Sequence, residues 1–201
     1  MRTVRTASFL LLLVVLLAAV SCSELEGSGE VTTETRTISD FTALEASNGV
    51  TVTLTIDPQT GNDVDLAVTT DSNLMEYLTT RVSGDRLTVS VDRSDRVMST
   101  TGFEVSGTVR ALDDIQVNNG AEATIIGTAP SVTLDINNGA RLRGEELEVG
   151  DATVDLNNGA SAVICAAGTV TGEVANGADL SVRCGGDFST IETSGGGLVS
   201  P

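Results

Sequence analysis

From residue 36 onward, apolar side chains recur at every second position over several segments. Residues 50–56 read Val-Thr-Val-Thr-Leu-Thr-Ile, and residues 64–68 and 87–91 repeat the same alternation. A period of two residues places alternate side chains on opposite faces of an extended chain. The pattern therefore predicts a half-buried β-strand at each of the three segments.

Two segments between these strands carry other signals. Residues 83–85, Ser-Gly-Asp, separate two alternating runs and predict the turn of a β-hairpin. Residues 72–78 predict a short helix, because Ser72 can cap the first turn and Leu74 and Leu78 share one face. The first half of the chain is therefore expected to be strand-rich with a single helical turn.

The C-terminal half repeats one short motif four times. In each copy an aliphatic strand residue is followed by asparagine, glycine and alanine, and the Asn-Gly pairs are Asn119 and Gly120, Asn138 and Gly139, Asn158 and Gly159, and Asn176 and Gly177. The glycines are spaced by 19, 20 and 18 residues. Residues 193–195 resemble a fifth copy, and residues 47–49 are an outlying relative that opens the first strand.

A repeat of this length cannot bury an apolar face alone, so consecutive copies are expected to stack. Each copy holds two or three alternating segments, which suits one coil of a parallel β-helix with a rise of about 4.8 Å per coil. Asn-Gly suits the corner of a coil because both residues tolerate positive φ, and stacked asparagine amides can hydrogen-bond along a column. A series of separate Asn-Gly hairpins is the alternative.

We therefore predict an all-β protein. Residues 111–197 are expected to form a short right-handed parallel β-helix with coils of about 18–20 residues, as the glycine spacing indicates. Residues 36–110 would supply the opening strands, the hairpin and the cap on the first coil. Residues 36–201 then make up a single domain.

Composition removes several classes of chemistry. The 201 residues include 28 acidic and 11 basic ones, all of them Arg, with no His and no Trp, and the net charge is −17. Without His there is no imidazole base, imidazole metal ligand or Ser-His triad, and without Lys there is no Schiff base. The negative charge disfavours nucleic acid and anionic lipid as partners of the folded part.

Carboxylates are the abundant reactive groups that remain. Asp135, Asp155 and Asp179 lie near the Asn-Gly motifs, and residues 113–114 and 145–146 are adjacent acidic pairs. Stacked oxygens can bind Ca²⁺, and two converging carboxylates can hydrolyse a glycoside. A solvated acidic face is the simpler interpretation, because the glycine-rich calcium repeat is absent and the chain has a single Tyr. We predict no catalytic residue, no metal site and no cofactor.

Residues 1–21 have the layout of a secretory signal peptide. Arg2 and Arg5 precede the apolar run 9–20, and small residues follow it. A spanning helix needs about 20 apolar residues, so this run is short for an uncleaved anchor, which is the alternative.

The four residues that end this segment carry a further signal. Ala-Val-Ser-Cys at 19–22 resembles the lipobox of bacterial lipoproteins, whose cysteine is acylated and becomes the new N-terminus. The resemblance implies that Cys22 carries a lipid anchor, and an ordinary signal peptide is the alternative. Residues 22–35 are polar, acidic and contain glycine, which predicts a flexible tether.

The two remaining cysteines, Cys165 and Cys184, are 19 residues apart, which is about one coil. Neighbouring strands lie about 4.8 Å apart, within the Cα separation that a disulfide accepts. An even number of cysteines in an exported protein usually oxidises. We predict a disulfide between them, and two free buried thiols are the alternative.

The order of the motifs resembles the head GIN domain family. The matching segments are residues 36–38, 41–44, 48–50, 71–74 and 82–89, and the family's Ser-Gly-Ala-Ser corner looks like Asn-Gly-Ala here, complete as Asn-Gly-Ala-Ser at residues 158–161. The resemblance spans roughly residues 36–197. It implies a family described as autotransporter adhesins and brings no catalytic residues with it.

These observations predict a lipid-anchored, non-enzymatic binding or scaffold module that is exported to the cell envelope, at the outer membrane or cell surface. Its expected partners are the membrane, through the anchor, and an extracellular glycan or protein. Two other functions stay open: a carbohydrate-active enzyme on a β-helix, and a Ca²⁺-stabilised structural module of the envelope.

Overall fold

The computed structural model describes residues 25–92, 97–98 and 101–201, and these residues form an all-β protein. The predicted signal peptide, residues 1–21, and Cys22 lie outside the described residues. The elements are β1 (Leu25–Glu26), β2 (Val31–Ser39), β3 (Ala43–Ser47), β4 (Thr51–Ile56), β5 (Asp63–Asp71), the 3₁₀ helix η1 (Ser72–Tyr77), β6 (Leu78–Ser83), β7 (Arg86–Val91), β8 (Val97–Met98), β9 (Glu104–Val109), β10 (Asp114–Asn118), β11 (Glu122–Ile136), β12 (Arg141–Leu156), β13 (Ser161–Ala166), β14 (Thr169–Val174), β15 (Asp179–Arg183), β16 (Asp187–Thr193) and β17 (Leu198–Ser200).

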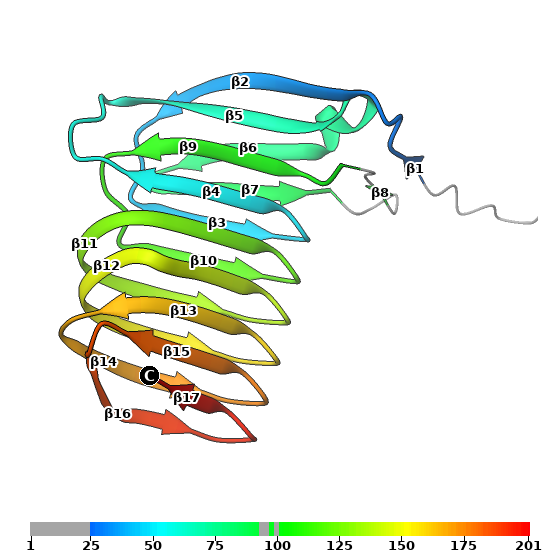
Figure 1. Ribbon diagram of the computed structural model, residues 1–201. Coiled ribbons are helices and arrows are strands. Elements are labelled where there is room, and N and C mark those ends of the chain that lie inside the picture. Colours follow the sequence, from blue (N-terminus) through cyan, green and yellow to red (C-terminus); the bar gives the residue numbers. More distant parts are fainter. Residues whose placement is uncertain (1–24, 93–96, 99–100) are drawn as a thin grey trace, which may run out of the picture.

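The C-terminal half is a stack of layers, each made of a strand, an Asn-Gly or Gly-Gly corner and a second strand (Figure 1). All pairs among β10–β17 are parallel. Asp114 pairs with Thr133 and Thr133 pairs with Thr153, so one layer corresponds to one copy of the motif. Consecutive copies therefore lie on adjacent layers, and the alternative of separate Asn-Gly hairpins is wrong for this half.

In the N-terminal half, the order of layers in space differs from their order in the chain. β3 and β4 form a layer that lies between β7 and β9 on one side and β10 and β11 on the other, with parallel pairing throughout. Three antiparallel pairs, β2–β5, β5–β9 and β6–β7, close this end of the stack. Residues 36–110 thus contribute both a layer and a cap. The chain forms β3 and β4 first, and the later strands β7 and β9 pair with them on the cap side.

The predicted hairpin is confirmed, whereas the predicted helix is only partly so. Ser83 pairs with Arg86 across the β6–β7 turn. The helical segment is a 3₁₀ helix of 6 residues, its N-cap is Asp71 rather than Ser72, and no side chain caps it. The adjacent residues Leu74 and Met75 are both buried, and Leu78 already begins β6, so the segment has no room for a second α-helical turn.

The interior consists of rows of apolar side chains that run through the layers. Leu87, Leu44, Ile115, Leu134 and Val154 are register partners in sequence along one row, and each is almost fully buried. Removal of these rows from water is the main stabilising contribution to such a stack. The three strands predicted at residues 50–56, 64–68 and 87–91 are confirmed by the burial of their alternating apolar positions.

Residues 25–35, which the sequence predicts as part of a flexible tether, are paired in the structure. β2 begins at Val31 and pairs with β5 along its whole length, from Val31–Asp71 to Ser39–Asp63. β1 pairs with β8. The polar composition of residues 31–35 fits an edge strand that exposes most of its side chains, so composition alone did not distinguish this strand from a linker.

Candidate functional site

The most regular feature of the surface is the column of Asn-Gly corners. The asparagines of the corners adopt left-handed φ values between 51° and 65°, and the glycines that follow them are also left-handed; these asparagines are Asn48, Asn119, Asn138, Asn158 and Asn176. Glycine adopts this conformation freely, and asparagine tolerates it better than most side chains do. The motif is therefore a consequence of the turn that each layer needs.

The asparagine side chains form a ladder of hydrogen bonds from layer to layer. Asn119 Nδ2 donates to Asn48 Oδ1 at 3.4 Å, Asn138 donates to Asn119 at 3.2 Å, and Asn158 donates to Asn138 at 3.1 Å. At the cap end, Asn48 Nδ2 donates to the carbonyl oxygen of Val91 at 3.1 Å. Residues 47–49, the outlying relative in the sequence, are therefore the first layer of the same column.

The ladder changes in the last layers. Asn176 Nδ2 donates to Asn157 Oδ1 at 2.8 Å instead of to Asn158. The fifth corner consists of Gly195 and Gly196, with φ values of +54° and +85°. Gly196 is the counterpart of Gly177, so this copy is shifted by one residue from the predicted position at residues 193–195.

One face of the stack carries a row of carboxylates, which we call the acidic row. Its members Asp135, Asp155, Glu173 and Glu192 are register partners on four adjacent layers. A row of threonines runs beside it, consisting of Thr133, Thr153, Thr171 and Thr190. Part of both rows lines an open groove with a volume of about 430 Å³. This face is polar, regular and negatively charged.

The acidic row affects the ionisation of Asp135. Burial, together with the neighbouring carboxylates of Asp155 and Asp114, raises the pKa of Asp135 above its ordinary value of 3.8. A hydrogen bond from the Asn137 amide opposes that shift. The carboxylates thus repel one another across the layers, because adjacent strands bring them close together.

The other face of the stack is more balanced in charge. Arg141 and Arg143 project from β12 on this face, and Arg143 forms an ion pair with Glu122 of β11, in the preceding layer. Arg141 Nε donates to Ser161 Oγ at 3.2 Å. The arginines therefore lie among serine and carboxylate side chains.

A cavity of about 610 Å³ lies at the bends opposite the Asn-Gly corners. Its lining is mainly apolar and includes Pro58, Leu112 and Pro130, with Arg110 at its edge. The Arg110 guanidinium donates to backbone and side-chain oxygens of the loop at residues 60–62. No local sequence pattern indicates this cavity, because Pro58 and Pro130 are far apart in the chain.

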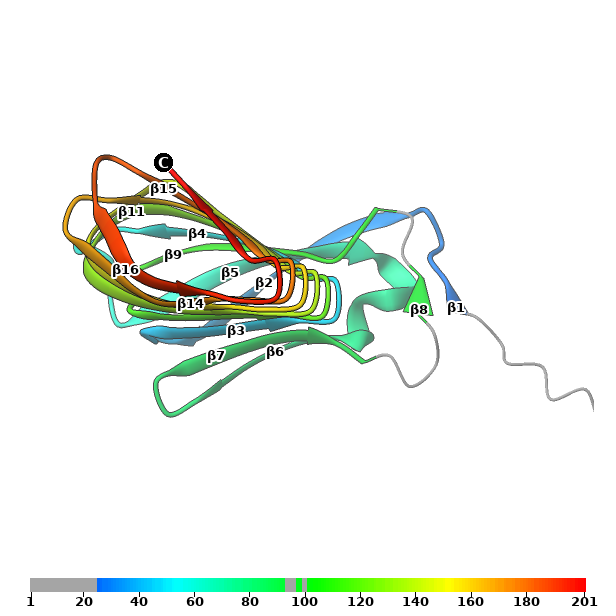
Figure 2. The ribbon, with the colours of Figure 1, turned by 90° about the horizontal axis from the view of Figure 1, so that it is seen from below.

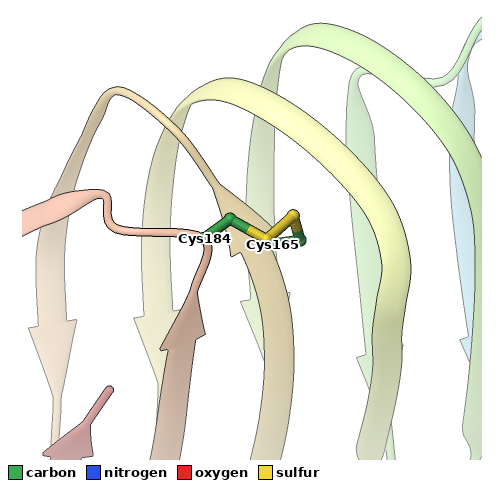
Figure 3. The surroundings of a disulfide bond; sticks show 2 residues. All are labelled: Cys165 and Cys184. Carbon is green, nitrogen blue, oxygen red and sulfur yellow. A yellow bond between two sulfur atoms is a disulfide. The ribbon is translucent and has the colours of Figure 1, made fainter.

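The predicted disulfide is confirmed. Cys165 and Cys184 are bonded, with a Cα–Cα distance of 5.1 Å, and the bond joins the ends of β13 and β15 (Figure 3). The register partner of Cys165 is Arg183, so Cys184 lies one residue further along. A left-handed φ of 70° at Cys184 accommodates this extra residue. The alternative of two free thiols is wrong.

Two features are absent from the described part of the chain. No group of three or more His, Cys, Asp or Glu side chains is arranged to hold a metal ion. No helix in the described ranges is long and apolar enough to cross a bilayer. The acidic row therefore presents its carboxylates one to a layer and does not gather them around one point.

Comparison with known proteins gives one family match. Residues 40–128 and residues 114–186 match the model of a family described as "Putative auto-transporter adhesin, head GIN domain". Among curated proteins, none is significantly similar to the chain.

Several solved structures match the chain over most of its length. A "putative adhesin" from Bacteroides fragilis is 12% identical, with a TM-score of 0.48, and the match covers 88% of this chain and 98% of that one. A "putative adhesin" from Parabacteroides merdae is 15% identical, with a TM-score of 0.42 and the same coverage. A "putative lipid binding protein" from Parabacteroides distasonis is 14% identical, with a TM-score of 0.38, and the match covers 89% of this chain and 99% of that one.

Proposed function

Because this chain belongs to the head GIN domain family, we propose that it is a non-enzymatic binding or scaffold module with an adhesin-like role at the cell surface. Family membership is the observation that carries the proposal. The surface supports it, since carboxylate and threonine side chains are repeated one to a layer along one face. A repeated polar face suits a repeated or extended partner, such as a glycan or an extracellular protein.

We propose that the chain is exported by a signal peptide at residues 1–21 and anchored through a lipid on Cys22. The lipobox-like sequence at residues 19–22 supports this assignment. The protein would then be held at the outer membrane or cell surface, with the domain of residues 36–201 outside the bilayer. Several acyl chains on one protein make such an anchor stable, whereas a single chain is marginal.

We propose further that the layered half is a right-handed parallel β-helix whose coils are 18–20 residues long. The parallel pairing of β10–β17 and the offset of one motif per layer support this description. A crystal structure of the soluble domain would test the hand of the coil. A left-handed path between consecutive layers would contradict the proposal.

The binding function is tested best with the soluble domain. We would screen a Cys22→Ser chain that lacks residues 1–21 against immobilised glycans and extracellular matrix proteins. Saturable binding that falls when Asp155 and Glu173 are changed to Asn and Gln would place the contact on the acidic row. The matched control removes charge from the other face with Arg141→Gln and Arg143→Gln.

Failure of the soluble domain to bind any glycan or protein would contradict the adhesin-like role. The anchor is tested separately in cells. Cys22→Ser is expected to release the protein from the membrane fraction, and continued membrane association would contradict lipidation at Cys22.

A further inference from the structure

Residues 25–30, the short segment before β2, are fastened to the cap by hydrogen bonds. The Asn73 side chain, which we call the clamp, makes two of them. Asn73, which lies on η1, donates from Nδ2 to the carbonyl oxygen of Glu26 at 2.9 Å, and its Oδ1 accepts from the Ser28 amide at 2.8 Å. The Asn73 side chain therefore binds the segment on both sides of Gly27, much as a neighbouring β-strand would. Leu25 adds an apolar contact with the core.

Asp71 holds the same segment one residue further along. Its Oδ1 accepts from the Gly29 amide at 2.6 Å, and the Ser72 amide donates to the Glu30 carbonyl at 2.8 Å. Asp71 has 0% of its surface exposed. A Cβ atom at Gly27 would clash with the Asp71 carboxylate, so the backbone of the segment passes directly over this side chain.

This fastened segment lies on the same side of the molecule as the Asn-Gly corners. The end of β5 lies beside the start of β9, where Thr69 pairs with Glu104, and Glu104 pairs with Thr51 just after the Asn48 corner. Figure 2 shows β1 beyond the tight turns of the stack and on their side. The chain therefore leaves the domain toward its N-terminus from the corner side, at the cap end.

The corners form an edge without charge in a strongly acidic protein. We define the corner edge as residues 47–50, 118–121, 137–140, 157–160, 175–178 and 194–197, which contain no Asp, Glu or Arg. The whole chain has a net charge of −17. By contrast, the bends on the opposite side include Glu145, Glu146 and Asp151. Glu122, Asp135, Asp155 and Asp179 lie one or two residues outside this edge. The edge itself can contact lipid headgroups without desolvating a carboxylate, and the opposite bends cannot.

We infer that the corner edge faces the bilayer and that the opposite bends face away from it. The inference rests on the proposed lipid at Cys22. Three residue steps separate Cys22 from Leu25, so the anchor lies within about 11 Å of the fastened segment. The occupant of the corner edge is thus the lipid headgroup surface, and both faces and the bends stay accessible to a partner from outside the cell.

Single tryptophans provide the test, because the chain has none of its own. The mature chain beginning at Cys22 would be coupled through that cysteine to maleimide lipid in phosphatidylcholine vesicles that carry a spin-labelled headgroup quencher. The disulfide leaves Cys22 as the one free thiol of the three cysteines. Asn118→Trp and Ser194→Trp report on the corner edge at two layers, and Ala111→Trp and Ala167→Trp are the matched controls at the bends.

Asn118 is the last residue of the 5-residue strand β10, and Ala111 lies in the bend before its start, so about 17 Å of strand separates the corner from the bend. We therefore expect the quencher to reduce the corner fluorescence about twofold more than the bend fluorescence. Quenching of both corner tryptophans supports the inference. Quenching of Asn118→Trp alone would mean that the stack stands on its cap end, and equal or stronger quenching at the bends would mean a reversed or free orientation. Either result overturns the inference.

The clamp has its own control. Asn73 is exposed, so Asn73→Ala is expected to fold normally. It should reduce the difference between corner and bend quenching but not abolish it, because Asp71 and Ser72 still hold residues 29 and 30. An unchanged difference would show that the clamp does not set the orientation. Because the lipid is attached chemically in this experiment, its outcome is independent of whether cells acylate Cys22, which the Cys22→Ser release assay decides.

Discussion

The two halves of the domain use the same strand-corner-strand layer but assemble it differently. In the C-terminal half each layer pairs with the layer one motif away in the chain, as Asp114 does with Thr133. In the N-terminal half the Asn48 corner meets Asn119, 71 residues later, and Arg36 of β2 donates to the carbonyl oxygens of Leu78 and Met75. The first half is held by long-range contacts and the second by contacts between neighbours.

This difference has an energetic meaning. A stack of nearest-neighbour layers is stabilised by the sum of its interfaces, and its free end can open one layer at a time. The interlocked half cannot open in that way, because the β3–β4 layer is covered on both sides. The single disulfide joins layers near the free end. The disulfide thus joins the layers that would otherwise open most easily, because only contacts between adjacent layers hold them.

Leu44→Ala is expected to have the largest effect. Leu44 is fully buried in the covered β3–β4 layer, and loss of such a side chain costs about 4 kcal/mol of the free energy of unfolding. Urea denaturation should show a loss for the whole domain. The matched control is Leu180→Ala, also fully buried but near the free end, where hydrogen exchange should rise only in β14–β17. Faster exchange in β2–β9 of the control would contradict the comparison.

Removal of the disulfide comes next. The combined change Cys165→Ala and Cys184→Asn is expected to cost about 3 kcal/mol by the loop-entropy relation. Asn is chosen because Cys184 has a left-handed φ. We expect the loss to appear as protease cleavage and hydrogen exchange confined to the last layers. Global unfolding at unchanged cooperativity would show that the free end does not open independently.

The ladder is tested at Asn138, in the middle of the column. Asn138→Ala loses two ladder contacts and strains a left-handed residue, so we expect a loss of about 2 kcal/mol in the free energy of unfolding. Asn138→Gly keeps the backbone conformation and loses only the ladder, about 1 kcal/mol. Equal stabilities of Asn138→Gly and the parent chain would show that the ladder adds nothing beyond the turn.

The smallest expected effect concerns the acidic row. Burial and the neighbouring carboxylates raise the pKa of Asp135 in the folded state. Between pH 3.8 and that raised pKa, the Asp135 carboxyl is therefore protonated more often in the native protein than in the unfolded chain. Stability should therefore fall as pH rises through that interval, and Asp135→Asn should remove this loss and stabilise the protein at neutral pH. Urea titrations at acidic and neutral pH check it, with exposed Glu148→Gln as control. Lower stability of Asp135→Asn at neutral pH would contradict the prediction.

The sequence was informative where the chain repeats. The spacing of Gly120, Gly139, Gly159 and Gly177 predicted that copies of the motif lie on adjacent layers, because a strand-corner-strand unit must occur once in each layer. The same spacing predicted that Cys165 and Cys184 lie close enough to form a disulfide. The strands of the first half and the hairpin also followed from alternation and turn chemistry, which act over a few residues.

The sequence was less informative about features that depend on pairing between segments far apart in the chain. Residues 31–35 have the composition of a linker, and only their pairing with β5 makes them a strand. Nothing local in the Pro58 or Pro130 segments predicted that they line one cavity. The acidic residues were visible as a group, but their alignment in one row depends on the register of four strands.

Sequence alone thus determined the period of the layers, the turn at each corner, the apolar interior and the family to which the chain belongs. Tertiary structure alone decided that the β3–β4 layer is inserted between two later ones, that Asn48 begins the ladder, and that residues 25–30 are fastened to Asp71 and Asn73. The physical reason is the distance along the chain over which each interaction acts. Backbone conformation and side-chain alternation are set within a few residues, whereas the choice of neighbour for an unpaired strand edge is made by segments far apart in the chain.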